Sequence, residues 1–136
     1  MRKLGMRSDH RWAVLRNMVT SLIHLERIQT TTPRAKELRR VADKLITHAK
    51  MNNITHRRLA GAVVQDKAAY VKLFEILGPR YHDREGGYTR VLKLQQSRHG
   101  DSSDLSVIEF VDREGELRKA RPPASRATLT TMEEIA

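Results

Sequence analysis

The chain of 136 residues has no cysteine, few aromatic residues and no long apolar run. The absence of cysteine excludes disulfide bonds and thiolate metal sites, and it favours a reducing compartment. No apolar stretch approaches the roughly 18–20 residues that a membrane-spanning helix needs, and no secretory signal is recognisable. Aromatic residues make up 4% of the chain and form no repeated array, which argues against a stacking platform for single-stranded nucleic acid. The 39% hydrophobic content fits one domain with an ordinary core.

Acidic residues are scarce in the N-terminal part of the chain. Residues 1–58 contain fourteen Lys or Arg and four Asp or Glu, and therefore carry the whole formal net charge of +10. Residues 59–136 contain twelve of each sign. Such a concentration of positive charge indicates a surface for a phosphate backbone, which binds Lys and Arg with release of counterions.

The residue types of catalytic and metal sites are present, but their spacing is wrong. The six histidines include no paired-ligand motif, and His48 and His56 fall on different predicted elements. The Ser-Asp-His run at residues 8–10 cannot form a catalytic triad, because adjacent residues on one turn cannot converge. The Gly-Gly pair at residues 86–87 lacks the continuation of a nucleotide-binding loop. We therefore expect no enzyme activity, metal, cofactor or small-molecule substrate.

Hydrophobic periodicity predicts four helices and a hairpin. The first helix, residues 8–25 with Ser8 as N-cap, has an apolar arc over about half its circumference, so we expect it to be the central core helix. The second runs from a Thr32 cap and Pro33 to about residue 50. Two shorter helices follow at residues 55–64 and 67–77, capped by Thr55 and Asp66, and Gly78 with the proline after it ends the second. Residues 26–31 indicate a short strand or extended link, and residues 88–95 and 105–112 indicate the strands of a hairpin.

Charge and composition also divide the chain. Residues 1–7 form a short basic arm, for which contact with RNA is a better interpretation than part of an import signal. Residues 8–115 form the domain. Residues 116–136 are rich in charge, proline and serine, and we expect a tail that is poorly ordered unless a partner holds it.

The predicted second helix carries a stripe of one sign opposite its apolar face. Lys36 and Arg40 are four residues apart and should repel each other by about 0.2–0.5 kcal/mol on an isolated helix. Asp43 relieves Arg39 but not that pair. A merely solvated face is the alternative, but the single sign of the stripe favours contact with phosphate. The glycines at 86–87 allow two compatible interpretations: a turn that needs positive φ, or a backbone that approaches RNA closely.

Several fragments of the sequence occur in a fixed order that resembles a known family. They are Ser8-x-His10-Arg11, Leu15-Arg16-Asn17-Met18, Ala35-Lys36-Glu37-Leu38-Arg39-Arg40, Leu77-Gly78-Pro79-Arg80-Tyr81, Gly86-Gly87-Tyr88-Thr89-Arg90 and Arg98-x-Gly100-Asp101. Over about residues 6–112 the chain resembles the family of the seventeenth large-subunit ribosomal protein, of bacterial and organellar type.

This resemblance implies a two-layer, single-domain α/β (α+β) fold, with about four helices packed on a small sheet that contains the C-terminal hairpin. It implies a non-enzymatic protein near the exit of the nascent-chain tunnel, bound to large-subunit rRNA and neighbouring ribosomal proteins. Residues 103–107 depart from the family pattern, which puts the loop conformation in doubt. Residues 113–118 look more like plant-type mitochondrial members, which favours the mitochondrion over the bacterial cytoplasm or a plastid.

The expected RNA-binding residues are the cations of the arm and the first three helices, together with the glycine turn and its flanking arginines. An alternative from another class is a free-standing DNA-binding or architectural protein. The expected set is Arg2, Lys3, Arg7, His10, Arg11, Arg16, Arg34, Lys36, Arg39, Arg40, Lys44, Arg57, Arg58, Arg80, Arg84, Gly86, Gly87, Arg90 and Arg98.

Overall fold

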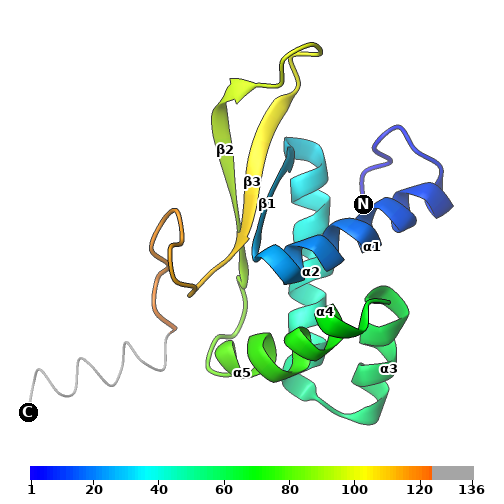
Figure 1. The fold of residues 1–136 in the computed structure, drawn as a ribbon, viewed down its shortest axis with the longest axis vertical. Helices are drawn as coiled ribbons and strands as arrows, with labels where there is room; N and C mark the ends of the chain where they lie inside the picture. Colours follow the sequence, from blue (N-terminus) through cyan, green and yellow to red (C-terminus); the bar gives the residue numbers. More distant parts are fainter. Residues whose placement is uncertain (124–136) are drawn as a thin grey trace, which may run out of the picture.

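A long helix, α2 (Thr32–Met51), runs between a small sheet and the remaining helices (Figure 1). The computed structural model describes residues 1–123. In that part of the chain α2 contacts all three strands, as well as helices on its other side. Leu38, Leu45 and Ile46 of α2 are almost fully buried. The architecture is a single α+β domain of two layers, as expected.

The sheet contains three antiparallel strands in the order β1-β3-β2. These are β1 (Arg27–Thr31), β2 (Thr89–Ser97) and β3 (Asp104–Phe110). Ile108 of the central strand pairs with Ile28 on one side and Val91 on the other, and it is fully buried. The predicted hairpin is therefore confirmed, and the uncertain segment at residues 26–31 is a strand.

The helix α1 (Ser8–Leu25) has the predicted length, but it is not the centre of the core. It buries one face, which includes Leu15, Val19 and Leu22, whereas Trp12 is 38% exposed and Leu25 is 65% exposed. The wide apolar arc was misleading because its edges face solvent. The central position belongs to α2, whose narrower stripe packs between the sheet and the other helices. The expected Ser8 cap is also wrong, because Arg7 is the N-cap residue and Ser8 begins the helix.

Two other predicted caps also differ from the structure. Thr31 precedes α2, and Thr32 is its first residue. The Thr32 hydroxyl lies 2.7 Å from Ser106 Oγ and donates to the carbonyl of Asp104, so it ties the helix to β3. The helix α3 (Ile54–Val63) is capped by Asn53, whose side chain accepts from the backbone of His56, and not by Thr55.

The sequence predicts that Gly78 ends the fourth helix, but the structure stays helical through this residue. Asp66 caps α4 (Lys67–Lys72) as expected, and the chain then continues through a π-helical turn, η1 (Leu73–Leu77), into α5 (Gly78–Arg80). Gly78 has helical φ and ψ angles of −55° and −58°. A Cβ atom there would lie 3.2 Å from the Ala49 carbonyl oxygen, so this glycine permits close packing of α5 on α2.

The segment after β3 folds back on the end of the sheet. The Glu116 carboxylate accepts hydrogen bonds from the backbone of Asp112 and Ala120, and Leu117 donates to the buried carboxylate of Glu109. The expected tail thus begins with contacts to the domain, and its residues 124–136 lie outside the described part. No helix in residues 1–123 is long and apolar enough to cross a membrane.

Candidate nucleic-acid interface

Three exposed cations form one row on α2. Lys36, Arg40 and Lys44 follow each other at intervals of four residues, so they lie along the same side of the helix. Within residues 1–123, no carboxylate oxygen lies within 4 Å of their charged groups. We call these three residues the α2 row. They provide unneutralised positive charge on a rigid helix, which suits phosphate binding.

Arg39 and Asp43 stand beside the α2 row and form a pair, with Nε 3.7 Å from Oδ2. Asp43 also accepts a 3.0 Å hydrogen bond from the Thr89 hydroxyl on β2. Burial raises the pKa of Asp43 and outweighs the hydrogen bonds from Thr89 and Arg39, which act in the opposite direction. The expected relief of Arg39 by Asp43 is confirmed. The hydrogen bond from Thr89 holds the Asp43 carboxylate against the sheet, and this carboxylate forms no ion pair with the α2 row.

A hollow of about 450 Å³ lies where α2 begins, beside the hairpin loop. It brings Arg34 together with Leu4 of the arm and Arg98 of the loop. A second hollow, of about 490 Å³, lies between α2 and β2 and includes Lys93. Lys93 was not among the predicted residues; its charge within the predicted strand at residues 88–95 was the only signal that the sequence offered. These hollows bring further cations to the beginning of α2 and to the side of the α2 row that faces β2.

The N-terminal arm turns back towards α1 and α2 (Figure 1). Arg11 donates to the carbonyl of Lys3 at 3.4 Å, and Arg7 pairs with Asp9 at 3.3 Å on the surface. Arg2, Lys3 and the side chain of His10 are exposed, whereas Arg16 is half-buried on α1. The structure therefore leaves most of the predicted N-terminal cations exposed to solvent.

The two predicted cations of α3 differ in their surroundings. The Arg57 guanidinium donates to Asn52 Oδ1 at 2.8 Å and lies 5.5 Å from the centre of the Phe74 ring. Arg58 is exposed, and no carboxylate of the described chain pairs with it. Arg57 thus contributes to packing as well as to surface charge, whereas Arg58 is available to a ligand.

Three arginines of the predicted RNA-binding set, two beside the glycine turn and one in the hairpin loop, all lie near acidic residues of the same chain. Arg84 binds both carboxylate oxygens of Asp112, at 2.9 and 3.1 Å, and its side chain is 13% exposed. Arg90 lies 3.9 Å from the Glu109 carboxylate, and Arg98 pairs with Asp101. The hydrogen bond from Arg98 lowers the pKa of Asp101, with help from Ser103. The pairs of Arg84 and Arg90 join distant segments of the fold, whereas the Arg98 pair lies within the exposed hairpin loop. The contact of these arginines with RNA stays a prediction.

The glycine turn has the backbone conformation that the sequence predicted. Gly86 has φ of 144° and Gly87 has φ of 63°, both in regions that L side chains rarely adopt. A Cβ atom at either position would meet nothing within 4 Å. The requirement for positive φ is therefore confirmed. The open space around the turn would let a ligand approach, but such an approach also remains a prediction.

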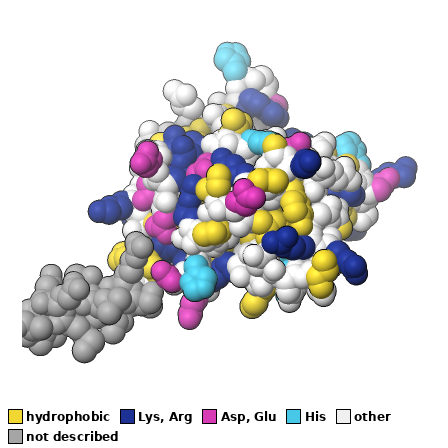
Figure 2. All heavy atoms as spheres, turned by 60° about the horizontal axis from the view of Figure 1, so that its bottom comes forward, with side chains coloured by type: hydrophobic (Ala, Val, Ile, Leu, Met, Phe, Trp, Pro, Cys, Tyr) yellow, Lys and Arg dark blue, Asp and Glu magenta, His cyan; other side chains and the backbone are white. Residues whose placement is uncertain are grey.

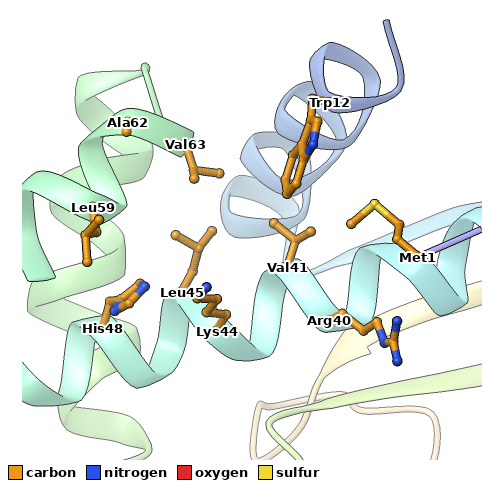
Figure 3. A pocket seen from close by; sticks show the side chains of 10 residues that line it. All are labelled: Met1, Trp12, Arg40, Val41, Lys44, Leu45, His48, Leu59, Ala62 and Val63. Atoms are coloured by element: carbon orange, nitrogen blue, oxygen red, sulfur yellow. The ribbon is translucent and has the colours of Figure 1, made fainter. Parts of the chain in front are cut away.

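An apolar groove of about 430 Å³ lies between α1, α2 and α3 (Figure 3). Trp12, Val41, Leu45, Leu59 and Val63 line it, with Arg40, Lys44 and His48 along the α2 side. Nothing in the sequence indicated this groove, because its walls come from three helices and from Met1 of the arm, whose packing cannot be read from periodicity. We call it the Trp12 groove.

Large apolar side chains are also exposed at the helical end of the molecule. Met51, Ile54, Leu59, Val71 and Ile76 are each between 39% and 66% exposed. Figure 2 brings this end forward and shows apolar side chains gathered among Lys and Arg. In residues 1–123, no three His, Asp or Glu side chains are close enough to hold a metal ion.

Comparison with known proteins supports the family suggested by the motifs. The family described as Ribosomal protein L17 matches residues 14–111. The protein "Large ribosomal subunit protein bL17" of Anaeromyxobacter sp. is 54% identical over 112 residues, which is 82% of this chain and 66% of that relative. The proteins of the same name from Syntrophotalea carbinolica and Pelobacter propionicus are 51% and 46% identical; the matches cover 83% and 93% of this chain, and 72% and 94% of those relatives.

Proposed function

This chain belongs to the ribosomal protein L17 family, and we propose that it is a structural, non-enzymatic constituent of the large ribosomal subunit that binds rRNA through its phosphates. The α2 row carries this proposal. Lys36, Arg40 and Lys44 are exposed, share one sign and lie on a helix that is fixed between the sheet and the other helices. Bringing like charges together has a cost in the free protein, and phosphate would offset it.

Binding would combine neutralisation of charge with a fit of shape. Arginine can hold a phosphate through two parallel hydrogen bonds, whereas lysine acts as a point charge. Arg34, Arg58 and the arm extend the cationic surface around the α2 row. The arginines at positions 80, 84 and 90 pair with carboxylates of the chain, and we assign them mainly to holding the fold on which the free cations stand.

Family membership supports a proposal for the place of the chain on the particle. We propose a position near the exit of the nascent-chain tunnel, with neighbouring ribosomal proteins packed on the exposed apolar side chains of α3 and η1. The relatives compared above come from bacteria. They give no support to the mitochondrial location that residues 113–118 favoured, and we propose a ribosome of bacterial type.

The proposal is tested by adding the purified chain to large-subunit particles that lack their own copy. We expect stoichiometric cosedimentation that persists in high-salt gradients, together with poor competition by duplex DNA of equal charge. Duplex DNA that competes as well as rRNA fragments would support the free DNA-binding protein instead. Loss of the chain from the particles at moderate salt would contradict a structural role.

A further inference from the structure

The Trp12 groove has an apolar interior of a size that suits a small planar group. In Figure 3, the side chains of Trp12 and Val63 point towards a space above Val41 and Leu45, which form its floor. Its volume of about 430 Å³ falls within the range of roughly 300–1,000 Å³ found for small-ligand pockets. Trp12 is 38% exposed there and Leu59 is 48% exposed. An occupant would therefore cover apolar surface that water now contacts.

The charged groups of the groove stand on one side. Arg40 and Lys44 lie along its α2 edge, and Figure 3 shows the Arg40 guanidinium pointing away from the floor. Neither group pairs with a carboxylate within residues 1–123. Both also belong to the α2 row. The best occupant consequently has an apolar, planar body joined to a negative group that stays outside.

We propose that the Trp12 groove holds a single unstacked RNA base, with the phosphate of that nucleotide on Arg40 and Lys44. A nucleotide has both required parts, and RNA offers such bases at bulges and loops, where proteins stack them on aromatic side chains. An acidic peptide with apolar side chains would also match the charge. The RNA base is favoured because the groove shares two cations with the surface proposed for phosphate. The inference rests on the proposed binding of rRNA.

Trp12 is the single tryptophan of the chain, so its fluorescence reports directly on the groove. The probes are three RNA hairpins of one sequence: one with a bulged adenosine, one with an abasic nucleotide at the bulge and one fully paired. At saturation and fixed salt, we expect the bulged adenosine to quench Trp12 and the other two hairpins to leave its emission unchanged. Affinity is measured separately by the anisotropy of a label on the RNA.

Two variants test the groove from opposite walls. Trp12→Leu removes the stacking surface and should weaken binding of the bulged hairpin by about 5- to 150-fold, while affinity for the abasic hairpin stays the same. Leu59→Glu keeps Trp12 as a reporter and places a negative charge in the groove, so it should abolish the quenching. Ile54→Glu is the matched control, because Ile54 is on the same helix, is 66% exposed and does not line the groove. Thermal melts establish that each variant is folded.

The outcomes separate this inference from the proposed function. Equal affinity for the three hairpins without any Trp12 response would overturn the base site, and salt-sensitive binding would then leave rRNA binding in place. Failure to bind any hairpin would overturn both. A Trp12 response to an acidic, leucine-rich peptide but not to saturating RNA would also overturn the base site and identify a groove for protein.

Discussion

Arg80 and Glu26 form a two-point ion pair, with Nη1 2.7 Å from Oε2 and Nη2 3.2 Å from Oε1. Lys72 lies 3.0 Å from the same carboxylate. Glu26 follows the last residue of α1 with φ of 60°, so this carboxylate joins the end of α1 to α4 and α5. Arg80 belongs to a motif that resembles a ribosomal family, yet its nearest partner is an acid of its own chain.

We predict that Glu26→Gln destabilises the fold by about 1–3 kcal/mol at pH 7, because two cations lose a charged partner. Burial would raise the pKa of Glu26, but the hydrogen bonds and charges of Arg80 and Lys72 outweigh it and lower the pKa from 4.5 to about 2. A lowered pKa means that this stabilisation is complete above pH 4.5 and is lost as the pH falls towards 2.

Urea unfolding from pH 7 down to pH 2 checks both parts of this prediction. The difference between the wild-type protein and Glu26→Gln should shrink over the acidic range. Glu75→Gln is the control, because Glu75 is exposed on η1 and forms no ion pair within the described residues. A difference that stays constant down to pH 2 would contradict the assignment to the ionised carboxylate.

The α2 row gives the second prediction. Lys36→Gln, Arg40→Gln and Lys44→Gln together should leave the thermal melt unchanged or slightly higher, because they remove like-charge repulsion. Affinity for rRNA fragments should fall, and the slope of log affinity against log salt should decrease by roughly 0.7–0.9 for each phosphate that the variant no longer neutralises.

A control with the same change in net charge combines Lys67→Gln, Arg118→Gln and Lys119→Gln, since all three residues are exposed and none belongs to α2. The control should retain most of the salt slope. If both triple variants lose the same affinity, total charge and not the α2 row determines binding.

The features predicted correctly from the sequence are those encoded locally. The length of α1, the hairpin, the cap at Asp66 and the stripe on α2 follow from periodicity and from single residues at helix ends. The missed features depend on contacts between distant residues. Arg80 and Glu26 are 54 positions apart, and Arg84 and Asp112 are 28 apart. Periodicity shows that a residue is polar, but it does not show which charge will lie opposite it in the fold.

The third prediction concerns the glycine turn. Gly86→Ala should destabilise the protein by roughly 1–3 kcal/mol, because φ of 144° is strained for any side chain even where space is open. Gly61→Ala is the matched control: Gly61 lies within α3, and the nearest atom to an added Cβ is 3.6 Å away on the Tyr70 ring. Alanine there should be neutral or stabilising by up to about 1 kcal/mol. Equal unfolding midpoints in urea for the two variants would show that the turn does not require glycine.

The fourth prediction concerns two facing histidines. His48 Nδ1 lies 2.7 Å from His56 Nδ1, so a single proton forms the hydrogen bond between the two ring nitrogens. Burial lowers the pKa of His48, and the charges of His56 and Lys44 lower it further. The contribution of neutral His48 to the stability of the fold is therefore present above pH 6.5. It is lost as the pH falls through the lowered pKa that His48 has in the folded state. We expect the melting temperature to fall between pH 7.5 and pH 5, and to fall less in His56→Gln. His99→Gln, in the exposed hairpin loop, should behave as the wild type.

Arg84 gives the last prediction, because it decides between a structural arginine and an RNA contact. Besides its two bonds to Asp112, it donates to the carbonyl of Arg121 at 2.7 Å and so fastens the segment after β3. Arg84→Gln should loosen that segment and speed cleavage after Glu114 and Glu116 by a glutamate-specific protease by about 5- to 10-fold, which corresponds to about 1–1.4 kcal/mol of local stability. Arg58→Gln, at an exposed cation without a partner acid in the described chain, should leave cleavage unchanged and weaken rRNA binding. The reverse pattern, with weakened affinity and unchanged cleavage in Arg84→Gln, would assign Arg84 to the RNA and leave Asp112 as the group that holds it in place.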